Sequence, residues 1–389
     1  MRPNDGPKFV TPTARSRRTV RHLVLVGGGH SHALVLRRLV GRPLIDTQIT
    51  LISDVEQAPY SGMLPGHLAG FYRREEVHID LRSLCHSVGA EFVHASADGL
   101  DLTTRRVLCD GKPRGPEADL LSINVGSSPR VDSVPGAAQW VIPSKPVPQL
   151  LAGWEVVKAA AFGGNRSLRI LVVGGGAGGV ELTLALQSQL MGHALFTLVH
   201  DGPRLLPGHN ARVLTLLSPV LSSRGVTVLL NQRVTEVQRE CARLRSGEWV
   251  PADFVFWITE PSPPAWLRNT DLLLDERGFI RVESTLQAVR HPGVFAAGDV
   301  ATIEGSPLPK SGVFAVRMAV PLEANLRAVC EGRALRGYKP QRHFLSLIGT
   351  ADGRAVASRR FLAAHSRLMW RWKDRIDRRF MRQFDIDGL

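Results

Sequence analysis

The sequence predicts an α/β protein with two three-layer domains built on parallel sheets, followed by a small C-terminal α+β interface unit. Three observations predict this fold. Two similar segments run from an apolar strand through a glycine turn into a helical pattern, each segment is followed by a second apolar strand, and short alternating apolar runs precede an amphipathic helical pattern near the C-terminus. A chain of 389 residues, 44% of them hydrophobic, is long enough for two or three such domains.

Composition excludes several classes of protein. The apolar fraction excludes an intrinsically disordered chain. The cysteines form no close pair, which excludes a disulfide framework, a Cys-x-x-Cys redox centre and a local zinc clip. The remaining histidines show no metal-ligand spacing, so no metal site is expected. Apolar runs stay below the roughly 18 residues of a membrane span. We therefore expect a cytoplasmic protein.

Positive charge is concentrated at the two ends of the chain. Lys and Arg number 49 against 35 Asp and Glu, a net charge of +14. We expect residues 1–20 to form a disordered basic extension. An export signal at Arg17-Arg18 is disfavoured, because the apolar run that follows is short and ends in glycines.

The first strand–turn–helix segment starts at residue 22. The apolar run 22–26 leads into Gly27-Gly28-Gly29, and a helical pattern follows over 33–40. Gly27 permits a tight turn, and Gly29 lets backbone N–H groups approach a pyrophosphate at the helix N-terminus. His32 takes the place of the usual third glycine. We expect it to be either a packing residue or an imidazole close to the ligand.

The second segment carries the complete glycine pattern. An apolar strand over 170–173 is followed by Gly174, Gly176 and Gly179 and by a helical pattern over 180–190. One such Rossmann-like unit binds one dinucleotide. Two units therefore predict two nucleotide ligands, most simply a flavin (FAD) and a nicotinamide nucleotide.

Each unit has an acidic residue about twenty residues after its glycines, where an acid that binds the ribose is expected. In both units the acid comes one position late, as Ser53-Asp54 and as His200-Asp201. His200 and Arg204 also leave room for a 2′-phosphate, so the choice between NADH and NADPH stays open.

Two later strand ends complete the flavin signals. The stretch 119–129 supplies a strand and the glycine turn at Gly126, where the chain leaves the first domain. The run 294–297 ends in Gly298-Asp299, which delivers a carboxylate to the end of a parallel sheet, where it can hold a ribityl hydroxyl.

These motifs, in this order, resemble the two-dinucleotide flavoproteins of the pyridine nucleotide–disulfide oxidoreductase superfamily. Finer motifs resemble its type II NADH dehydrogenase-like branch, in particular flavoproteins that occur alone or fused N-terminally to selenophosphate synthase. These motifs are Gly-Gly-Gly-His-Ser-His (27–32), Pro-Tyr-Ser-Gly-Met-Leu-Pro-Gly (59–66), Val-His-Ile-Asp-Leu (77–81), Pro-Lys-Ser-Gly-Val-Phe-Ala-Val-Arg (309–317) and the tryptophan- and arginine-rich stretch 370–381.

The resemblance implies a domain plan and a set of site residues. It implies an FAD domain split over 21–142 and 267–330, an NAD(P)H domain over 143–266 and a C-terminal interface region over 331–389. Glu181 is expected beside the nicotinamide amide. Lys310, with the helix start at Gly312-Val313, is expected at the pyrimidine edge of the flavin. Further FAD contacts are expected from His30, Ser31, Tyr60, Ser61, Gly62 and Met63.

Three features depart from relatives or limit the reaction. The second domain has Ile258-Thr259-Glu260 where a final glycine is usual, so its exit turn can differ. Met318 stands where quinone-reducing relatives often have Gln. No cysteine pair is placed to attack a flavin, which argues against disulfide reductase and sulfide:quinone chemistry.

The C-terminal region predicts a hairpin and an amphipathic helix. The runs 344–348 and 355–358 flank an Asp-Gly turn. Over 361–384, apolar residues recur at three- and four-residue steps among arginines. This helix either docks on an anionic membrane surface, as a peripheral protein on the inner face of the cytoplasmic membrane, or packs on its own protein or on a second subunit of a homodimer. Nothing resembles a nucleic-acid-binding element.

The expected activity is an FAD-dependent NAD(P)H oxidoreductase that passes electrons to a quinone or a similar acceptor. The alternatives are a reductase of a soluble acceptor linked to selenium metabolism, and a non-catalytic flavin or nucleotide sensor.

Overall fold

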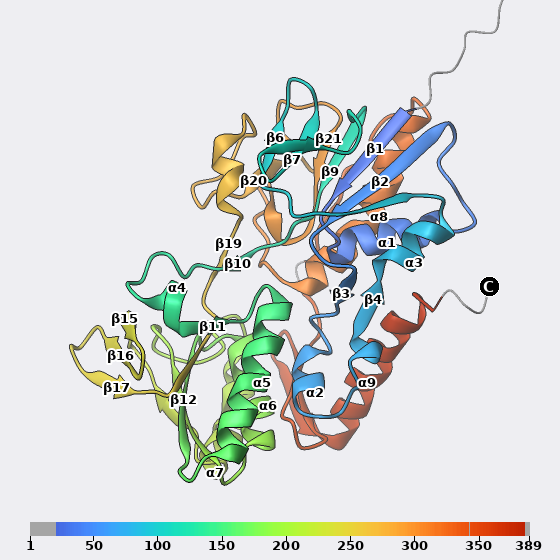
Figure 1. Ribbon diagram of the computed structural model, residues 1–389. Coiled ribbons are helices and arrows are strands. Elements are labelled where there is room, and N and C mark those ends of the chain that lie inside the picture. The colour runs from blue at the N-terminus through green and yellow to red at the C-terminus, as the bar shows by residue number, and fades with distance from the viewer. Residues whose placement is uncertain (1–20, 342, 386–389) are drawn as a thin grey trace, which may run out of the picture.

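A computed structural model describes residues 21–341 and 343–385, so the predicted basic extension at 1–20 lies outside the described residues. Two sheet domains lie one above the other, and the C-terminal unit packs beside the lower one (Figure 1). The described helices include none that is both long and apolar enough to cross a bilayer.

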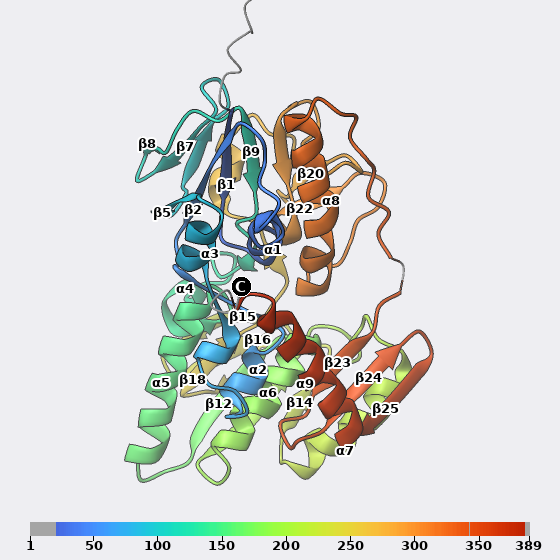
Figure 2. The ribbon, with the colours of Figure 1, turned by 90° about the vertical axis from the view of Figure 1, so that its right-hand side faces the viewer.

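The first domain is built on a five-stranded parallel sheet in the order β21-β9-β1-β2-β5. Residues 23–26 of its central strand β1 are buried, because this apolar run is covered on both faces of the sheet. Helix α8 packs along α1 on one side of this sheet (Figure 2). The elements are β1 (Arg21–Val26), α1 (His30–Leu39), β2 (Thr47–Ser53), α3 (Leu81–Ser87), β5 (Glu91–His94), β9 (Leu120–Ile123), β21 (Val294–Ala296), η3 (Gly298–Val300) and α8 (Gly312–Cys330).

The second domain repeats this plan with a parallel sheet in the order β11-β18-β12-β13-β14. Its elements are β11 (Val141–Pro143), α5 (Val147–Gly163), β12 (Leu168–Val173), α6 (Ala177–Gln189), β13 (Ala194–Val199), α7 (Ala211–Ser223), β14 (Thr227–Leu229) and β18 (Phe254–Trp257). Two antiparallel segments, β10 (Ser128–Pro129) and β19 (Pro261–Ser262), connect the domains. Strand β11, which begins two residues before the predicted domain start at residue 143, pairs within the second sheet. The domain bounds stay a prediction.

Both domains also contain short strands in small sheets and short helices. They are β3 (Gln57–Pro59), α2 (Leu64–Leu68), η1 (Glu75–Val77), β4 (His78–Asp80), β6 (Gly99–Asp101), β7 (Arg106–Cys109), β8 (Lys112–Arg114), α4 (Ala137–Trp140), β15 (Val234–Gln238), β16 (Cys241–Leu244), β17 (Trp249–Pro251), η2 (Ala265–Asn269), β20 (Ile280–Val282) and β22 (Ala301–Ile303).

The C-terminal unit is a three-stranded antiparallel sheet followed by one helix. Strands β23 (Ser346–Gly349) and β24 (Ala355–Arg359) form the predicted hairpin, and β25 (Leu362–Ser366) adds a third strand. Helix α9 (Arg367–Arg382) therefore starts later than the predicted residue 361, because 362–366 pair with β24 instead. The Ser366 side chain caps α9 by accepting the N–H of Met369. The helix lies against this sheet and approaches α2 (Figures 1 and 2).

Candidate functional site

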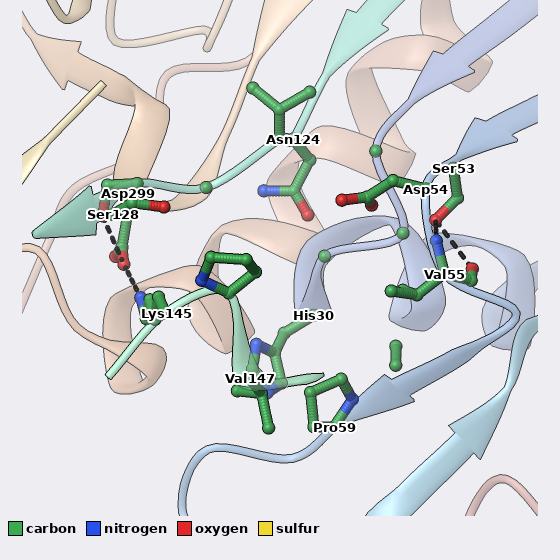
Figure 3. A pocket seen from close by; sticks show the side chains of 18 of the residues that line it. His30, Ser53, Asp54, Val55, Pro59, Asn124, Ser128, Lys145, Val147 and Asp299 are labelled. Carbon is green, nitrogen blue, oxygen red and sulfur yellow. Dashed lines mark hydrogen bonds and ion pairs between the residues drawn. The ribbon is translucent and has the colours of Figure 1, made fainter. Parts of the chain in front are cut away.

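A cavity of about 410 Å³ opens at the carboxyl ends of the strands of the first domain, where ligands of open parallel sheets bind (Figure 3). Predicted residues from six separate stretches of the chain meet in its wall. They are Gly27, Gly29, His30, Ser53, Asp54, Ser61, Gly126, Asp299 and Gly312.

The first glycine turn is a cradle that side chains would fill. Gly27 has φ +90°, and a Cβ added there would lie 2.6 Å from the carbonyl oxygen of Asn124. A Cβ on Gly29 would lie 2.3 Å from the Asn124 side-chain oxygen. The turn leads directly into the N-terminus of α1, which favours an anion. These features fit the pyrophosphate of FAD.

Asn124 organises this turn, although no sequence motif selects it and only its place directly after a strand marks it. Its Oδ1 accepts the backbone N–H groups of Ser31 at 3.2 Å and of His32 at 3.3 Å. Its Nδ2 donates to the carbonyl of Ala297 at 2.6 Å. One amide thus joins the turn to the segment that carries Asp299.

His30 projects into the cavity as a neutral imidazole (Figure 3). Burial and the nearby Lys145 cation lower its pKa to about 4, against a smaller opposing effect of Asp299. Its Nε2 accepts the backbone N–H of Ser61 at 3.4 Å, and its ring contacts the Tyr60 ring edge-on, with centroids 5.6 Å apart.

Asp299 forms an ion pair with Lys145, a residue that the sequence analysis did not predict at this site. Lys145 Nζ lies 2.9 Å from Asp299 Oδ2 (Figure 3). The Ser127 hydroxyl donates to the same oxygen at 3.3 Å. Lys145 stands just before α5, in the part of the chain assigned to the other domain. Its sequence neighbourhood therefore gave no sign that it reaches the first cavity.

Lys310 lies near the site, but its ammonium group already has partners. Nζ donates to the carbonyl of Ala301 at 2.6 Å and to the hydroxyl of Thr302 at 2.9 Å, and it lies 4.0 Å from the centroid of the Phe279 ring. Burial lowers its pKa to about 8. The structure thus gives Lys145 the position facing Asp299, whereas a catalytic role of Lys310 stays a prediction.

Three other predicted contacts, with Tyr60, Gly62 and Met63, support the cavity from behind. The Tyr60 ring stacks on Phe380, with centroids 4.3 Å apart, and the Gly62 carbonyl accepts from Lys373. Met63 is buried in a small cluster of its own. Together they brace the loop whose Ser61 reaches the cavity wall.

The second glycine turn has the same construction. Gly174 has φ +128°, and a Cβ on Gly179 would lie 1.7 Å from the Gly174 carbonyl oxygen, so helix and strand touch there. His200 packs against Gly175 in this turn. Asp201 lies 3.5 Å from both the His200 ring and Arg233. The preference for NADH or NADPH stays open, because cationic and acidic groups lie side by side.

A second cavity of about 260 Å³ lies between the domains. The second domain contributes Gly178, Leu182, Ile258 and Thr259, and the first contributes the segment 61–68 and the predicted Lys310. Both cavities share the wall residues Ser61, Ser127, Ser128, Lys145, Val147 and Asp299. A group in one cavity therefore borders the other.

Glu181, on α6, faces the C-terminal unit. Its Oε1 accepts the N–H of Gly349 at 2.7 Å. Burial raises its pKa, and the nearby Lys373 cation opposes that effect. Glu181 is three residues beyond Gly178 of the second cavity, so its contact with a nicotinamide amide stays a prediction.

Helix α9 closes this region with a buried ion pair. Lys373 Nζ lies 2.7 Å from Asp377 Oδ2 and donates to the Gly62 carbonyl at 2.6 Å. The Tyr60 hydroxyl donates to Asp377 Oδ1 at 3.2 Å. Both charged side chains are buried, so the inner face of this helix is more polar than its sequence pattern indicated.

The chain matches the family described as "Pyridine nucleotide-disulphide oxidoreductase" over residues 21–319. Demethylphylloquinone reductase NdbB of Synechocystis is 24% identical over 352 residues, which cover 86% of each protein. NADH dehydrogenase-like protein YutJ of Bacillus subtilis is 22% identical over 91% of this chain and 99% of its own length. The sulfide:quinone oxidoreductase of Aquifex aeolicus superposes with a TM-score of 0.76 at 18% identity, over 94% of this chain and 91% of its own, and this likeness shows the fold alone.

Proposed function

Because the chain belongs to the pyridine nucleotide-disulphide oxidoreductase family, we propose that it carries electrons from NAD(P)H through FAD to a quinone at an anionic membrane surface. The family makes the chain an NAD(P)H-dependent oxidoreductase that uses FAD, and the relatives confirm the predicted NADH dehydrogenase-like branch. The link to selenophosphate synthase stays a prediction.

The shared wall of the two cavities carries this proposal. The first glycine turn and Asp299 border one cavity, and Gly178 and Leu182 of the nicotinamide domain border the other. Hydride transfer needs donor and acceptor atoms about 3–3.5 Å apart, which a common wall allows. FAD, when bound, supplies the chemistry by accepting a hydride and then releasing two electrons.

The residues of the chain bind and orient the two nucleotides and supply charge near them. The turn at Gly27–Gly29 offers N–H groups to a pyrophosphate, and Asp299 offers a carboxylate to ribityl hydroxyls. The Lys145 cation stands at the shared wall, where it stabilises negative charge that develops during transfer. Glu181 remains our candidate for orienting the nicotinamide amide.

A quinone acceptor is supported by relatives and by the cysteines. The relative NdbB is named for the reduction of demethylphylloquinone. The four cysteines, Cys85, Cys109, Cys241 and Cys330, are free and lie outside both cavity walls. Burial also raises the pKa of Cys85 to about 12 and raises the pKa of Cys109, so neither is a ready thiolate. Sulfide:quinone and disulfide chemistry therefore lack their reactive thiol at this site.

The acceptor is tested by mixing NADH-reduced protein anaerobically with one acceptor at a time. We expect a short-chain quinone to restore the oxidised flavin spectrum fastest. Slow reoxidation by every quinone, together with fast reoxidation by a soluble selenium compound, would show that the acceptor is a soluble compound and not a quinone.

The outer face of α9 supports a membrane surface as partner. Leu368, Trp372 and Ile376 are exposed to 65%, 44% and 41%. Five exposed arginines share this side of the helix, and none of them has an ion pair within the described residues. They are Arg367, Arg371, Arg375, Arg379 and Arg382. Exposed aromatic and aliphatic side chains among arginines are typical of a helix that lies in an anionic interface.

Sedimentation with phosphatidylglycerol vesicles tests this docking. We expect the triple variant R371Q/R375Q/R379Q and the variant W372S/I376S to lose most vesicle binding while they retain FAD. The triple variant R239Q/R243Q/R245Q removes the same charge from exposed positions of the second domain and should bind like the unmodified protein. Equal losses in both triple variants would show that net charge, not α9, drives binding.

A further inference from the structure

His32 occupies the place where the second domain has Gly179, and its environment assigns it a different task. In the second domain a Cβ at Gly179 would lie 1.7 Å from the Gly174 carbonyl oxygen. Since His32 has a Cβ, α1 cannot approach Gly27 as closely as α6 approaches Gly174. The gap is filled, because the His32 side chain is completely buried.

The imidazole of His32 bridges the glycine turn and the sheet. Its Nδ1 lies 2.8 Å from the carbonyl oxygen of Gly27, and its Nε2 lies 2.8 Å from the hydroxyl of Ser122 on β9. A carbonyl only accepts hydrogen bonds, so Nδ1 carries the proton. Nε2 of the neutral ring then accepts from the hydroxyl of Ser122. One tautomer of an uncharged ring therefore satisfies both partners.

The ring does not touch the dinucleotide cavity, whose wall contains His30 but not His32. Burial lowers the pKa of His32 to about 4, which agrees with a neutral ring in the core. The backbone N–H of His32 is also taken, by Asn124 Oδ1 at 3.3 Å. Of the two roles that the sequence left open, a packing residue or an imidazole close to the ligand, the structure favours the packing residue, which lies behind the glycine turn.

We propose that His32 is a positioning residue, a hydrogen-bonded spacer that holds the Gly27–Gly29 turn at the height above the sheet at which its N–H groups meet the FAD pyrophosphate. In the second domain direct helix–strand contact at Gly179 does this work. A glycine at position 32 restores the usual motif but leaves the Gly27 carbonyl and the Ser122 hydroxyl without their partner. The motif-restoring substitution therefore weakens FAD binding. This proposal rests on FAD binding in the first domain and not on the acceptor.

The test is a fluorescence titration of FAD-free protein with FAD. We expect His32→Gly to bind FAD about tenfold or more weakly, because two buried polar groups lose a partner. Gln can donate to Gly27 and accept from Ser122, so His32→Gln should bind within a few-fold of the unmodified protein. Ser122→Ala should weaken binding a few-fold, and it should add nothing in the His32→Gly background.

Nucleotide binding by the second domain is the control that distinguishes a specific loss of FAD affinity from a general loss of structure. Binding of NAD⁺, measured calorimetrically on the same samples, should be unchanged in all variants. FAD binding by His32→Gly as tight as that of the unmodified protein would overturn the proposal, as would an equal effect of Ser122→Ala in both backgrounds. Should His32→Gly not fold, unchanged FAD affinity of Ser122→Ala would overturn it. These titrations need no turnover, so a wrong acceptor leaves them untouched.

Discussion

At the scale of single residues, the two lysines near the cavities differ in what their ammonium groups can do. Lys145 pairs with Asp299 in the wall common to both cavities, whereas Lys310 is engaged by Ala301 and Thr302. Lys310 also lines the second cavity, but two oxygens already engage its ammonium group, so it has less freedom to meet a developing charge there.

Substitution of each lysine should distinguish a role in flavin reduction from a role in stability. We expect Lys145→Met to slow flavin reduction by NADH about tenfold, since it removes the cation from the shared wall. Lys310→Met should change that rate less and should mainly lower the melting temperature. Anaerobic stopped-flow absorbance measures the first effect and calorimetry the second. A larger rate effect in Lys310→Met would return the catalytic role to that lysine.

Buried histidines make the stability of FAD-free protein depend on pH. The pKa of His32 falls from 6.5 to about 4 on folding. Between these two values the unfolded chain takes up a proton that the folded chain does not, so acidification destabilises the fold. Above about pH 6.5 both states are neutral and the effect vanishes.

We therefore expect the urea midpoint to fall from about pH 7 to about pH 5, and to fall less steeply in His32→Gln. The comparison between the two proteins isolates His32 from the buried carboxyls, whose raised pKa values act in the opposite direction. Parallel pH profiles of the two proteins would show that the folded state accommodates a charged ring at this position.

The sequence allowed some of these residues to be predicted and not others. The glycines of both turns and Asp299 could be placed because each follows an apolar strand and parallel strands end together. Asn124 also follows a strand, but only the folded turn reveals its contacts. Lys145 reaches the cavity across a domain boundary, a relation that no local pattern contains.

At the scale of elements, α9 has two faces that follow from its repeat. An arginine followed by an apolar residue recurs every four residues at 367–368, 371–372, 375–376 and 379–380. Four residues turn a helix by about 40° more than one full turn, so the apolar line winds around the axis. Leu368, Trp372 and Ile376 consequently face outward, whereas Phe380 turns in and stacks on Tyr60.

The inner face of α9 depends on its buried ion pair. Lys373→Met leaves Asp377 buried without its cation, so we expect it to lower the free energy of unfolding by about 3 kcal/mol. The double variant Lys373→Met/Asp377→Leu should recover part of that loss, because no charge stays buried alone but Gly62 and Tyr60 still lose a hydrogen-bond partner. Arg378→Met removes the half-exposed pairs with Asp374 and Glu76 and should cost about 1 kcal/mol or less for each. Urea unfolding measures all three, and a double variant no more stable than Lys373→Met would contradict this account of the pair.

The start of α9 shows why its boundary could not be predicted. Residues 362–366 include two alanines and suit a helix locally, yet they form β25 because their backbone groups pair with β24. Tertiary pairing overrides such short propensities. The hairpin at 346–359 was predictable, since an Asp-Gly turn lies between two apolar runs.

At the scale of the whole molecule, two copies of one nucleotide-binding plan face each other across a shared wall. The connecting segments β10 and β19 cross together between the domains, and both cavities use residues next to β10. Repetition of the glycine pattern predicted the two domains. Their mutual placement could not be read from the repeat, because it depends on these crossings and on the contact of α2 with α6.

The most direct test of this arrangement is an anaerobic titration of the FAD-loaded protein with NADH and, separately, with NADPH. Juxtaposed cavities predict a yellow protein that loses its visible flavin band as stoichiometric nucleotide is added, with at least one of the two nucleotides. A protein that takes up no FAD, or a flavin band that neither nucleotide changes, would contradict it.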